Sequence, residues 1–458
     1  MKKDTVVELV KDQLLPLWEK DQAAIKVIDR WYRTEQDPIT TRRTNDKELK
    51  YLADISRTPW LALTIETVAQ GLKCEGVHTA TADDEELARV WRPWQINRLE
   101  RRQGPLHRAA LAYGLAYTLI LPGDAGARIT AFDPAQMLAL YKDPADDDFP
   151  MYAIRVIPQP KGATQYRVYD EESEYFLAQE STGGAMQFIE GRAHKVGYVP
   201  VVRYANRLDL QGRAPGEIEP LIPLAKRINK TDYDRMLTQH FNSWKVRTAT
   251  GLDEPGTPED REKQKMTLAQ RDIMTGGEGV TFGTLDETNL KPFIEAHDSD
   301  IESLAALSQT PTTTYGKLIN VSAEGLVEAK ASLRAKTGDR QTTFGASHMD
   351  TLRVAADVEG RADDALNFAL QPKWAEFSDQ TMSQAVDALG KAAQMLNVPP
   401  EVLWERIPGV DLTTVKGWLA HAKDNPSPER IQAEAVARQL MPTVPTDPAA
   451  PVMAPAAA

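Results

Sequence analysis

The stretch GRAPGEIEPLIPLAKRINKTDYDRMLTQHFNSWKVRTATG, residues 212–251, holds the longest uninterrupted amphipathic pattern in the chain. Its apolar side chains recur every three or four residues, at Ile218, Leu221, Ile222, Ala225, Ile228, Tyr233, Met236, Leu237, Phe241 and Trp244. This spacing places one apolar stripe along a helix, and Pro220 and Pro223 fall in its opening turns, where a missing N–H costs least. A helix of about 25 residues at ~1.5 Å per residue is a rod of about 40 Å, longer than most helices of globular proteins.

The polar face of this helix is rich in cations. It carries Lys226, Arg227, Lys230, Arg235, Lys245 and Arg247 against Glu217, Glu219, Asp232 and Asp234, in a chain of net charge -12. Two interpretations are open from the helix alone. It is either an ordinary bundle helix with a solvated face or a long strut that lines an assembly.

The composition is that of a soluble globular protein large enough for about two or three domains. Acidic residues number 66 and basic residues 54, a balance that argues against a protein built to grip nucleic acid, since each phosphate contact needs a cation. Cys74 is the only cysteine, which excludes an intramolecular disulfide and a multi-cysteine zinc site. No signal-peptide pattern or membrane-length apolar run is present, so we expect a protein made in the cytoplasm, or in a particle assembled there, without a membrane partner.

Helical and strand patterns occupy separate parts of the chain, which predicts an α+β fold. Before the long helix, helical spacing covers residues 4–32, with a break near Pro16, and then 59–72, 83–94 and 104–113. Short β-branched and aromatic segments follow at 116–121, 128–132, 137–141, 151–157, 165–170 and 174–179, and they predict an antiparallel sheet.

After the long helix, a small insert over 252–293 precedes a second helix over 294–307. A polar loop, TPTTTYGKLIN, spans 310–320. Ser322 is placed to cap another long helix, in which Gly338 and Gly345 predict a kink or break. Helical patterns continue to about residue 421, and a Pro- and Ala-rich tail ends the chain and is expected to be disordered.

Motifs for catalysis are missing from the sequence. There is no Gly-x-Ser-x-Gly elbow, no His-Glu-x-x-His and no Walker A lysine, and the seven histidines show no ligand spacing. The acidic turn at Asp143, Asp146, Asp147 and Asp148 does not fit an EF-hand. We therefore predict no catalytic residue, metal or cofactor, although carboxylates paired in space stay open as an alternative.

Several strings of the sequence occur in a characteristic order. They are ALAYGLAYTLILPG (110–123), ITAFDPAQMLALYKDP (129–144), GYVPVVRYANR (197–207), NVSAEGLVEAKASLRAK (320–336) and PKWAEFSDQTMSQAVDALGKAAQML (372–396). Together with the long helix, they make the chain resemble the portal proteins of tailed bacteriophages, of the siphophage type, from about residue 45 to 420.

This resemblance implies a dodecameric ring at one vertex of a virion capsid, assembled in the host cytoplasm, through which double-stranded DNA is packaged and ejected without sequence specificity. The implied regions are a wing (1–211), a stem helix (212–251), a clip (252–293), a second stem helix (294–309), a tunnel loop (310–321), a long kinked wing helix (322–353), a helical crown (354–424) and a disordered tail (425–458). The implied partners are the major capsid protein, a scaffolding protein, the terminase and a head-completion or adaptor protein.

The resemblance also suggests residues that face DNA. In the tunnel loop these are Thr312, Thr313, Thr314, Tyr315, Lys317 and Asn320. Candidates that line the channel along the stem are Arg227, Lys230, Arg235, Lys245 and Arg247. The competing functions are a metal-dependent nuclease and another capsid or head-joining protein.

Overall fold

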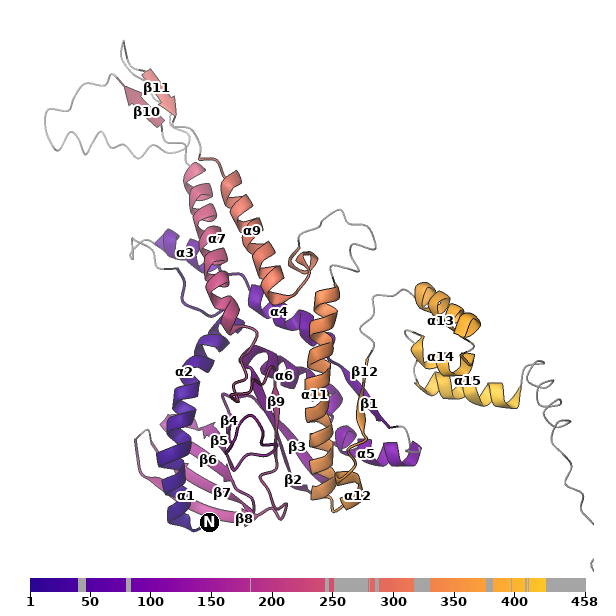
Figure 1. The fold of residues 1–458 in the computed structure, drawn as a ribbon. Coiled ribbons are helices and arrows are strands. Elements are labelled where there is room, and N and C mark those ends of the chain that lie inside the picture. Colours follow the sequence, from indigo (N-terminus) through magenta and orange to yellow (C-terminus); the bar gives the residue numbers. More distant parts are fainter. Residues whose placement is uncertain are drawn as a thin grey trace, which may run out of the picture. The chain divides into compact units, whose positions relative to one another are not determined.

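The computed structural model describes residues 1–39, 47–79, 84–181, 183–243, 247–250, 279, 281–284, 288–316, 330–375, 382–396, 398–407, 410 and 412–425. The chain divides into two compact units, Met1–Ala375 and Glu376–Ala458. Helices and sheets are both present, so the predicted α+β class is confirmed (Figure 1).

A five-stranded antiparallel sheet in the first unit follows the order of the sequence. Its strands are β4 (Met137–Leu140), β5 (Tyr152–Pro158), β6 (Thr164–Tyr169), β7 (Ser173–Gln179) and β8 (Met186–Ala193). One face packs against the N-terminal helix, where Val6, Val10 and Leu14 meet Val168 and Leu177 in a shared core. Alternating apolar residues on the strands supply this face.

The N-terminal helix is continuous where a break near Pro16 was predicted. A π-helical turn over Val10–Leu14 joins α1 (Lys3–Leu9) to α2 (Leu15–Tyr32). In a regular α-helix the proline ring would clash with the carbonyl four residues earlier. The wider π turn relieves that clash, so the helix continues.

A three-stranded sheet forms the centre of the first unit, in the order β3-β2-β9. Its strands are β2 (Leu115–Gly123), β3 (Gly126–Phe132) and β9 (Val201–Ala205). The 28-residue helix α11 (Ala331–Val358) packs against all three strands. The core between the helix and the sheet contains the buried side chains of Ile120, Ile129, Tyr204, Phe344 and Leu352.

Helix α11 passes through Gly338 and Gly345 as one helix, so the predicted break there is wrong. A Cβ atom at Gly345 would lie 2.7 Å from Pro372 Cγ. The glycine therefore serves close packing against β12 (Gln371–Trp374), which pairs with β1 (Cys74–His78). Neither β1 nor β12 was predicted, because Gly76 and Pro372 weaken their strand patterns.

The remaining helices of the first unit's body are α3 (Lys47–Ile55), α4 (Trp60–Ala69), α5 (Asp84–Ile96), α6 (Leu99–Tyr113) and α12 (Ala362–Ala365). Helices α5 and α6 pack against strands of this sheet, whereas α3 contacts α7 (Ile222–Asn242), α4 contacts α6, and α12 contacts α11. All the strands predicted between residues 116 and 179 are present, and β8 and β9 are additional.

A pair of helices projects from the body of the first unit (Figure 1). After a 3₁₀ turn (Glu219–Leu221), α7 runs over Ile222–Asn242, and α9 (Lys291–Ser308) lies beside it. The short strands β10 (Arg247–Thr250) and β11 (Thr281–Thr284) pair beyond their far ends. With 21 residues, α7 is shorter than the predicted rod. Trp244 and most of the predicted clip lie outside the described residues.

The second unit is helical. It contains α13 (Met382–Leu396), α14 (Pro400–Leu403), a 3₁₀ turn (Trp404–Arg406) and α15 (Leu412–Asp424). Trp404 and Trp418 meet edge to face, with ring centroids 6.1 Å apart. The end of α11, α12 and β12 belong to the first compact unit, which ends at Ala375. The tail beyond residue 425 lies outside the described residues.

Two glycines let the chain fold back onto the end of α6. Gly114 has a φ of +94°, and a Cβ there would lie 1.8 Å from the carbonyl oxygen of Ala214. A Cβ on Gly216 would lie 2.2 Å from the carbonyl oxygen of Ala112. The approach to α7 therefore depends on backbone contacts that a side chain would block.

We predict that Gly114→Ala lowers the free energy of unfolding by at least about 2 kcal/mol, because it adds a strained φ and a backbone clash. The matched control is Gly338→Ala, in the interior of α11, where a Cβ would meet nothing within 4 Å. That change should raise stability by about 0.5–1 kcal/mol. Urea unfolding of both variants checks this, and equal midpoints would contradict it.

Candidate functional site

The predicted channel-lining cations on α7 are ion-paired within the chain. Arg227 Nε lies 2.7 Å from Asp300 Oδ1 on α9, and Arg235 Nη2 lies 3.3 Å from Asp232 Oδ1. Lys230 pairs with Asp234 one turn along. These carboxylates neutralise much of the positive charge that the sequence places on this face. The side chain of Arg247, at the start of β10, and all of Lys245 lie outside the described residues.

The apolar stripe of the helix pair is covered only near its base. Ile228 on α7 and Leu304 on α9 are fully buried. Farther along, Phe241 is 59% exposed and Ile294 is 50% exposed. At the base end of α9, Leu307 is also exposed, by 66%, beside the buried Ser308. The outer half of the pair therefore presents large apolar side chains with no cover within the described chain.

The segment Thr312–Tyr315 forms a 3₁₀ turn after α9. Thr312, Thr313 and Thr314 are half-buried, and Lys317 and Asn320 lie outside the described residues. Tyr315 corrects a prediction, because its side chain is 6% exposed and points into the core. Its hydroxyl lies 2.8 Å from Thr64 Oγ1 and 3.0 Å from Ser308 Oγ, and its ring meets Trp60 edge to face. Tyr315 thus anchors this segment to α4 and α9.

A buried ion cluster lies at the base of the helix pair. Lys336 Nζ donates to Glu217 Oε2 at 2.7 Å, and Arg340 Nη2 donates to Glu217 Oε1 at 3.0 Å. Asn206 donates to the same carboxylate, and Lys336 also donates to the carbonyl of Ser308 at 2.9 Å. The cluster therefore ties the entry to α7 and the end of α9 to a single face of α11.

The surroundings of Glu217 determine its ionisation. Burial alone would raise its pKa, but the charge of Lys336 and hydrogen bonds from Lys336, Arg340 and Asn206 outweigh it and lower the pKa to about 2. The carboxylate is therefore ionised at neutral pH. The sequence suggested instead that Glu217 belongs to a solvated helix face, and its cationic partners Lys336 and Arg340 are more than a hundred residues away along the chain.

Two buried histidines form a second polar network, between α6, α11 and β9. His107 Nδ1 lies 3.0 Å from the carbonyl of Leu72, so it must carry the proton and donate. His107 Nε2 then accepts from His348 Nε2 at 2.8 Å, and His348 Nδ1 accepts from the Tyr204 hydroxyl at 2.9 Å. In this arrangement each ring carries a single proton, so both histidines are neutral.

Within the described residues, no group of three or more histidine, cysteine or acidic side chains could hold a metal ion. In the same part of the chain, no helix combines the length and apolarity needed to cross a membrane.

The fold and the site define an α+β protein in which a pair of helices, fixed at its base by buried ion pairs, projects from a body of sheets and helices. A family model described as "Phage portal protein, SPP1 Gp6-like" matches residues 12–427. The chain therefore belongs to this family of phage portal proteins, and the resemblance seen in the sequence is confirmed.

The chain is also similar to solved structures of gene transfer agent particles. A chain of "Virion of native gene transfer agent (GTA) particle" is 12% identical with a TM-score of 0.46, over 81% of this chain and 94% of that chain. A chain of "Neck of empty GTA particle computed with C6 symmetry" is 13% identical with a TM-score of 0.47, over 80% and 96%. A chain of "Neck of native GTA particle computed with C12 symmetry" is 12% identical with a TM-score of 0.47, over 80% and 96%. A comparison with curated protein sequences gives no match.

We predict that Glu217→Gln lowers the free energy of unfolding at pH 7 by about 3–5 kcal/mol, because Lys336 would stay buried without its carboxylate and Arg340 would keep only Asp339 as a charged partner. The matched control is Glu219→Gln, two residues away and exposed, which should change stability by less than about 0.5 kcal/mol. Glu217 stabilises the fold above its ordinary pKa of 4.5, and this contribution disappears as the pH falls toward 2. Urea unfolding at pH 7 and pH 3 should therefore show a smaller difference between wild type and Glu217→Gln at pH 3.

The histidine pair predicts a separate effect of pH on stability. Burial lowers the pKa of His107 to about 4 and holds the pKa of His348 well below its ordinary value of 6.5. Below pH 6.5 the unfolded chain takes up protons that the folded chain does not. Stability should fall by up to about 1.4 kcal/mol per pH unit for each histidine as the pH drops toward 4.

The measurement is the free energy of unfolding from pH 8 to pH 4. The variant His348→Gln should show a shallower decline than wild type, whatever its stability at pH 8. The matched control is His78→Gln, at an exposed histidine, which should keep the wild-type slope. A His348→Gln slope equal to that of wild type would contradict the assignment.

Proposed function

We propose that copies of this chain close into a ring-shaped channel at the unique vertex of a phage capsid, through which double-stranded DNA is packaged and later ejected. The observation that carries this proposal is the match of the portal family model across residues 12–427. In this proposal residues 1–211 form the wing, α7 and α9 form the stem, and the second unit lies in the crown.

The charges on the stem suit a conduit. A channel must let a polyanion slide, and each phosphate held by an unpaired cation would add a barrier to movement. On α7, Arg227, Lys230 and Arg235 each have a carboxylate partner within the chain. The chain's net charge of -12 also weakens its attraction for DNA. DNA would therefore meet a weakly attractive wall, and we assign these cations, with Lys245 and Arg247, a loose contact with DNA.

The exposed apolar residues of the stem suit contacts between subunits. A ring needs a heterologous interface, in which one face of a subunit meets a different face of the next, and the contacts close on themselves. Phe241, Ile294 and Leu307 lie on the two stem helices, where neighbouring subunits would cover them. We propose a dodecamer, in line with the resemblance found in the sequence.

The other partners follow from the same role. We propose that the ring contacts the major capsid protein and a scaffolding protein during assembly in the host cytoplasm, then the terminase, and finally a head-completion or adaptor protein in the virion. No membrane partner and no catalytic role are proposed. Thr312, Thr313 and Thr314, with Lys317 and Asn320, are proposed to face the channel, and Tyr315 anchors them.

We predict that the purified chain forms rings with a central hole wide enough for duplex DNA, visible by negative-stain microscopy, and that Phe241→Glu shifts it toward monomers. Burying one phenylalanine is worth about 1.5–3 kcal/mol, so the concentration needed for assembly should rise at least roughly tenfold. The matched control is Gln239→Glu, which adds the same charge at a nearby exposed position of α7 and should still assemble. Wild-type protein without rings, or rings that Phe241→Glu leaves intact, would contradict the proposal.

A metal-dependent nuclease is the alternative from a different class. Incubation of the purified chain with duplex DNA and magnesium distinguishes the two, because a conduit should leave the DNA intact. Another capsid or head-joining protein would also leave DNA intact, and it would lack a ring with a central hole.

A further inference from the structure

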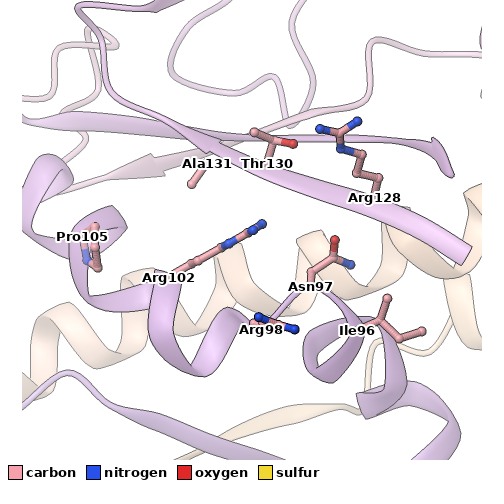
Figure 2. A pocket seen from close by; sticks show the side chains of 8 residues that line it. All are labelled: Ile96, Asn97, Arg98, Arg102, Pro105, Arg128, Thr130 and Ala131. Atoms are coloured by element: carbon pink, nitrogen blue, oxygen red, sulfur yellow. The ribbon is translucent and has the colours of Figure 1, made fainter. Parts of the chain in front are cut away.

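A cleft of about 500 Å³ lies between the edge of β3 and the corner where α5 meets α6. It is lined by Asn97, Arg98, Arg102, Pro105, Arg128 and Thr130, among others. Figure 2 shows Arg102 reaching from α6 toward β3, where Arg128 and Thr130 lie on the strand opposite. Ligand sites of about 300–1,000 Å³ are common, so the cleft is large enough for a few residues of another chain.

The three arginines of this cleft have no partner among the described residues. Arg98, Arg102 and Arg128 are exposed, and none forms an ion pair or side-chain hydrogen bond there. No carboxylate lines the cleft, although acidic residues outnumber basic ones in the chain. Three unpaired guanidinium groups at one place create a local positive field, and their planar fork suits a carboxylate.

The cleft also contains part of an open strand edge. Within the described sheet, β3 pairs with β2 on one side only. Asn97 covers the start of the other side, since its Nδ2 donates to the carbonyl of Ala127 at 2.8 Å and its Oδ1 accepts from Ile129 N at 2.9 Å. The side-chain amide thus makes the hydrogen bonds that a neighbouring strand would make.

Beyond Asn97, the next edge groups are the carbonyl of Ile129 and the N–H of Ala131. Ile120 on β2 lies opposite Ile129 on β3. Its N–H donates to the carbonyl of Pro200 at 2.9 Å, on the side of β2 that faces away from β3. In an antiparallel pair, opposite residues alternate between hydrogen-bonded and non-hydrogen-bonded pairs, and Ile120 and Ile129 form a non-hydrogen-bonded pair. The backbone N–H and C=O groups of Ile129 and Ala131 therefore point away from β2, toward the cleft. Neither the carbonyl of Ile129 nor the N–H of Ala131 has a hydrogen-bond partner among the described residues.

We propose that this cleft binds a short, extended, acidic segment of a partner protein. The segment adds to the edge of β3 through Ile129 and Ala131, and its carboxylates pair with Arg98, Arg102 and Arg128. Strand addition supplies backbone hydrogen bonds, and charge-assisted bonds to arginine supply selectivity. Side chains of a strand alternate between faces, so neighbouring acids reach Arg128 on one side and the arginines of the α5–α6 corner on the other.

A peptide fits these groups better than a nucleic acid does. The phosphate backbone offers only acceptors, and the exposed carbonyl of Ile129 would repel it, whereas a peptide has both donors and acceptors. Acidic runs in the described part of this chain already lie in folded elements, since Asp84–Glu86 belong to α5 and Asp146–Asp148 to a hydrogen-bonded turn. The occupant that we propose is a separate polypeptide, and this inference does not rest on the proposed channel.

The test uses the full chain and a fluorescent peptide in which Asp-Asp-Glu is flanked by valine and threonine. Fluorescence anisotropy at low ionic strength should show saturable binding that weakens with salt. A peptide with Asn-Asn-Gln should bind at least roughly tenfold more weakly, since it loses the charge-assisted bonds. A peptide that keeps the acids but carries a methyl group on a central amide nitrogen should also bind at least roughly tenfold more weakly, because it cannot pair with the strand edge.

The variant Arg98→Gln/Arg102→Gln should weaken binding by about 100-fold, with roughly tenfold for each charged contact. The matched control is Arg101→Gln, exposed on the same helix outside the cleft lining, which should bind like wild type. Unfolding midpoints establish that each variant is folded. Unchanged binding in the double variant would overturn the proposal.

Two competing occupants give distinct results. A labelled oligothymidylate that binds as tightly as the acidic peptide and is lost in the same double variant would identify a nucleic-acid site instead. If the assembled protein does not bind the peptide and the dissociated subunits do, a second copy of this chain is the occupant. Either result would overturn the assignment to an acidic partner.

Discussion

The buried pairing of Glu217 with Lys336 and Arg340 is the interaction on which the projecting helix pair depends. Removing such groups from water costs several kcal/mol each, so attraction within the cluster largely offsets desolvation and contributes little net stability. Its effect is geometric. Lys336 also binds the carbonyl of Ser308, so one face of α11 fixes both the start of α7 and the end of α9. A hydrophobic contact in the same place would allow the helices to slide, whereas charged hydrogen bonds specify one arrangement.

Other buried contacts make the same base rigid while the far end stays open. The Tyr315 hydroxyl joins α4 to the end of α9, and the His107–His348 pair joins α6 to α11. Gly114 and Gly216 let the connecting segment approach backbone to backbone. Beyond this base, Phe241 and Ile294 are at least half exposed. Buried contacts with the body of the chain therefore set the orientation of the helix pair, while part of its outer surface stays exposed.

Periodicity in the sequence was enough to predict the α+β class and most helices and strands, because burial of one face is a local property of a helix or strand. It failed where distant residues decide the outcome. Glu217 looks like any acid at a helix start, and only the fold brings Lys336 and Arg340 to it. Gly345 predicted a break because its role, space for Pro372, belongs to a strand outside its helix. Tyr315 looked like a loop residue for the same reason. The family strings carried information about function that no single motif contained.

The distribution of arginine and lysine partners separates two kinds of surface on this chain. On α7 each described cation that was expected to meet DNA has a carboxylate within reach, so its field is weakened where a polyanion would have to move. In the cleft beside β3, three arginines have no such partner. If the chain were selected only to let DNA move past it, the cations at both places would be expected to have carboxylate partners. An unpaired cation anywhere along the path of DNA would slow that movement. Positive charge left unpaired beside an open strand edge is instead what a lasting contact with an acidic chain requires.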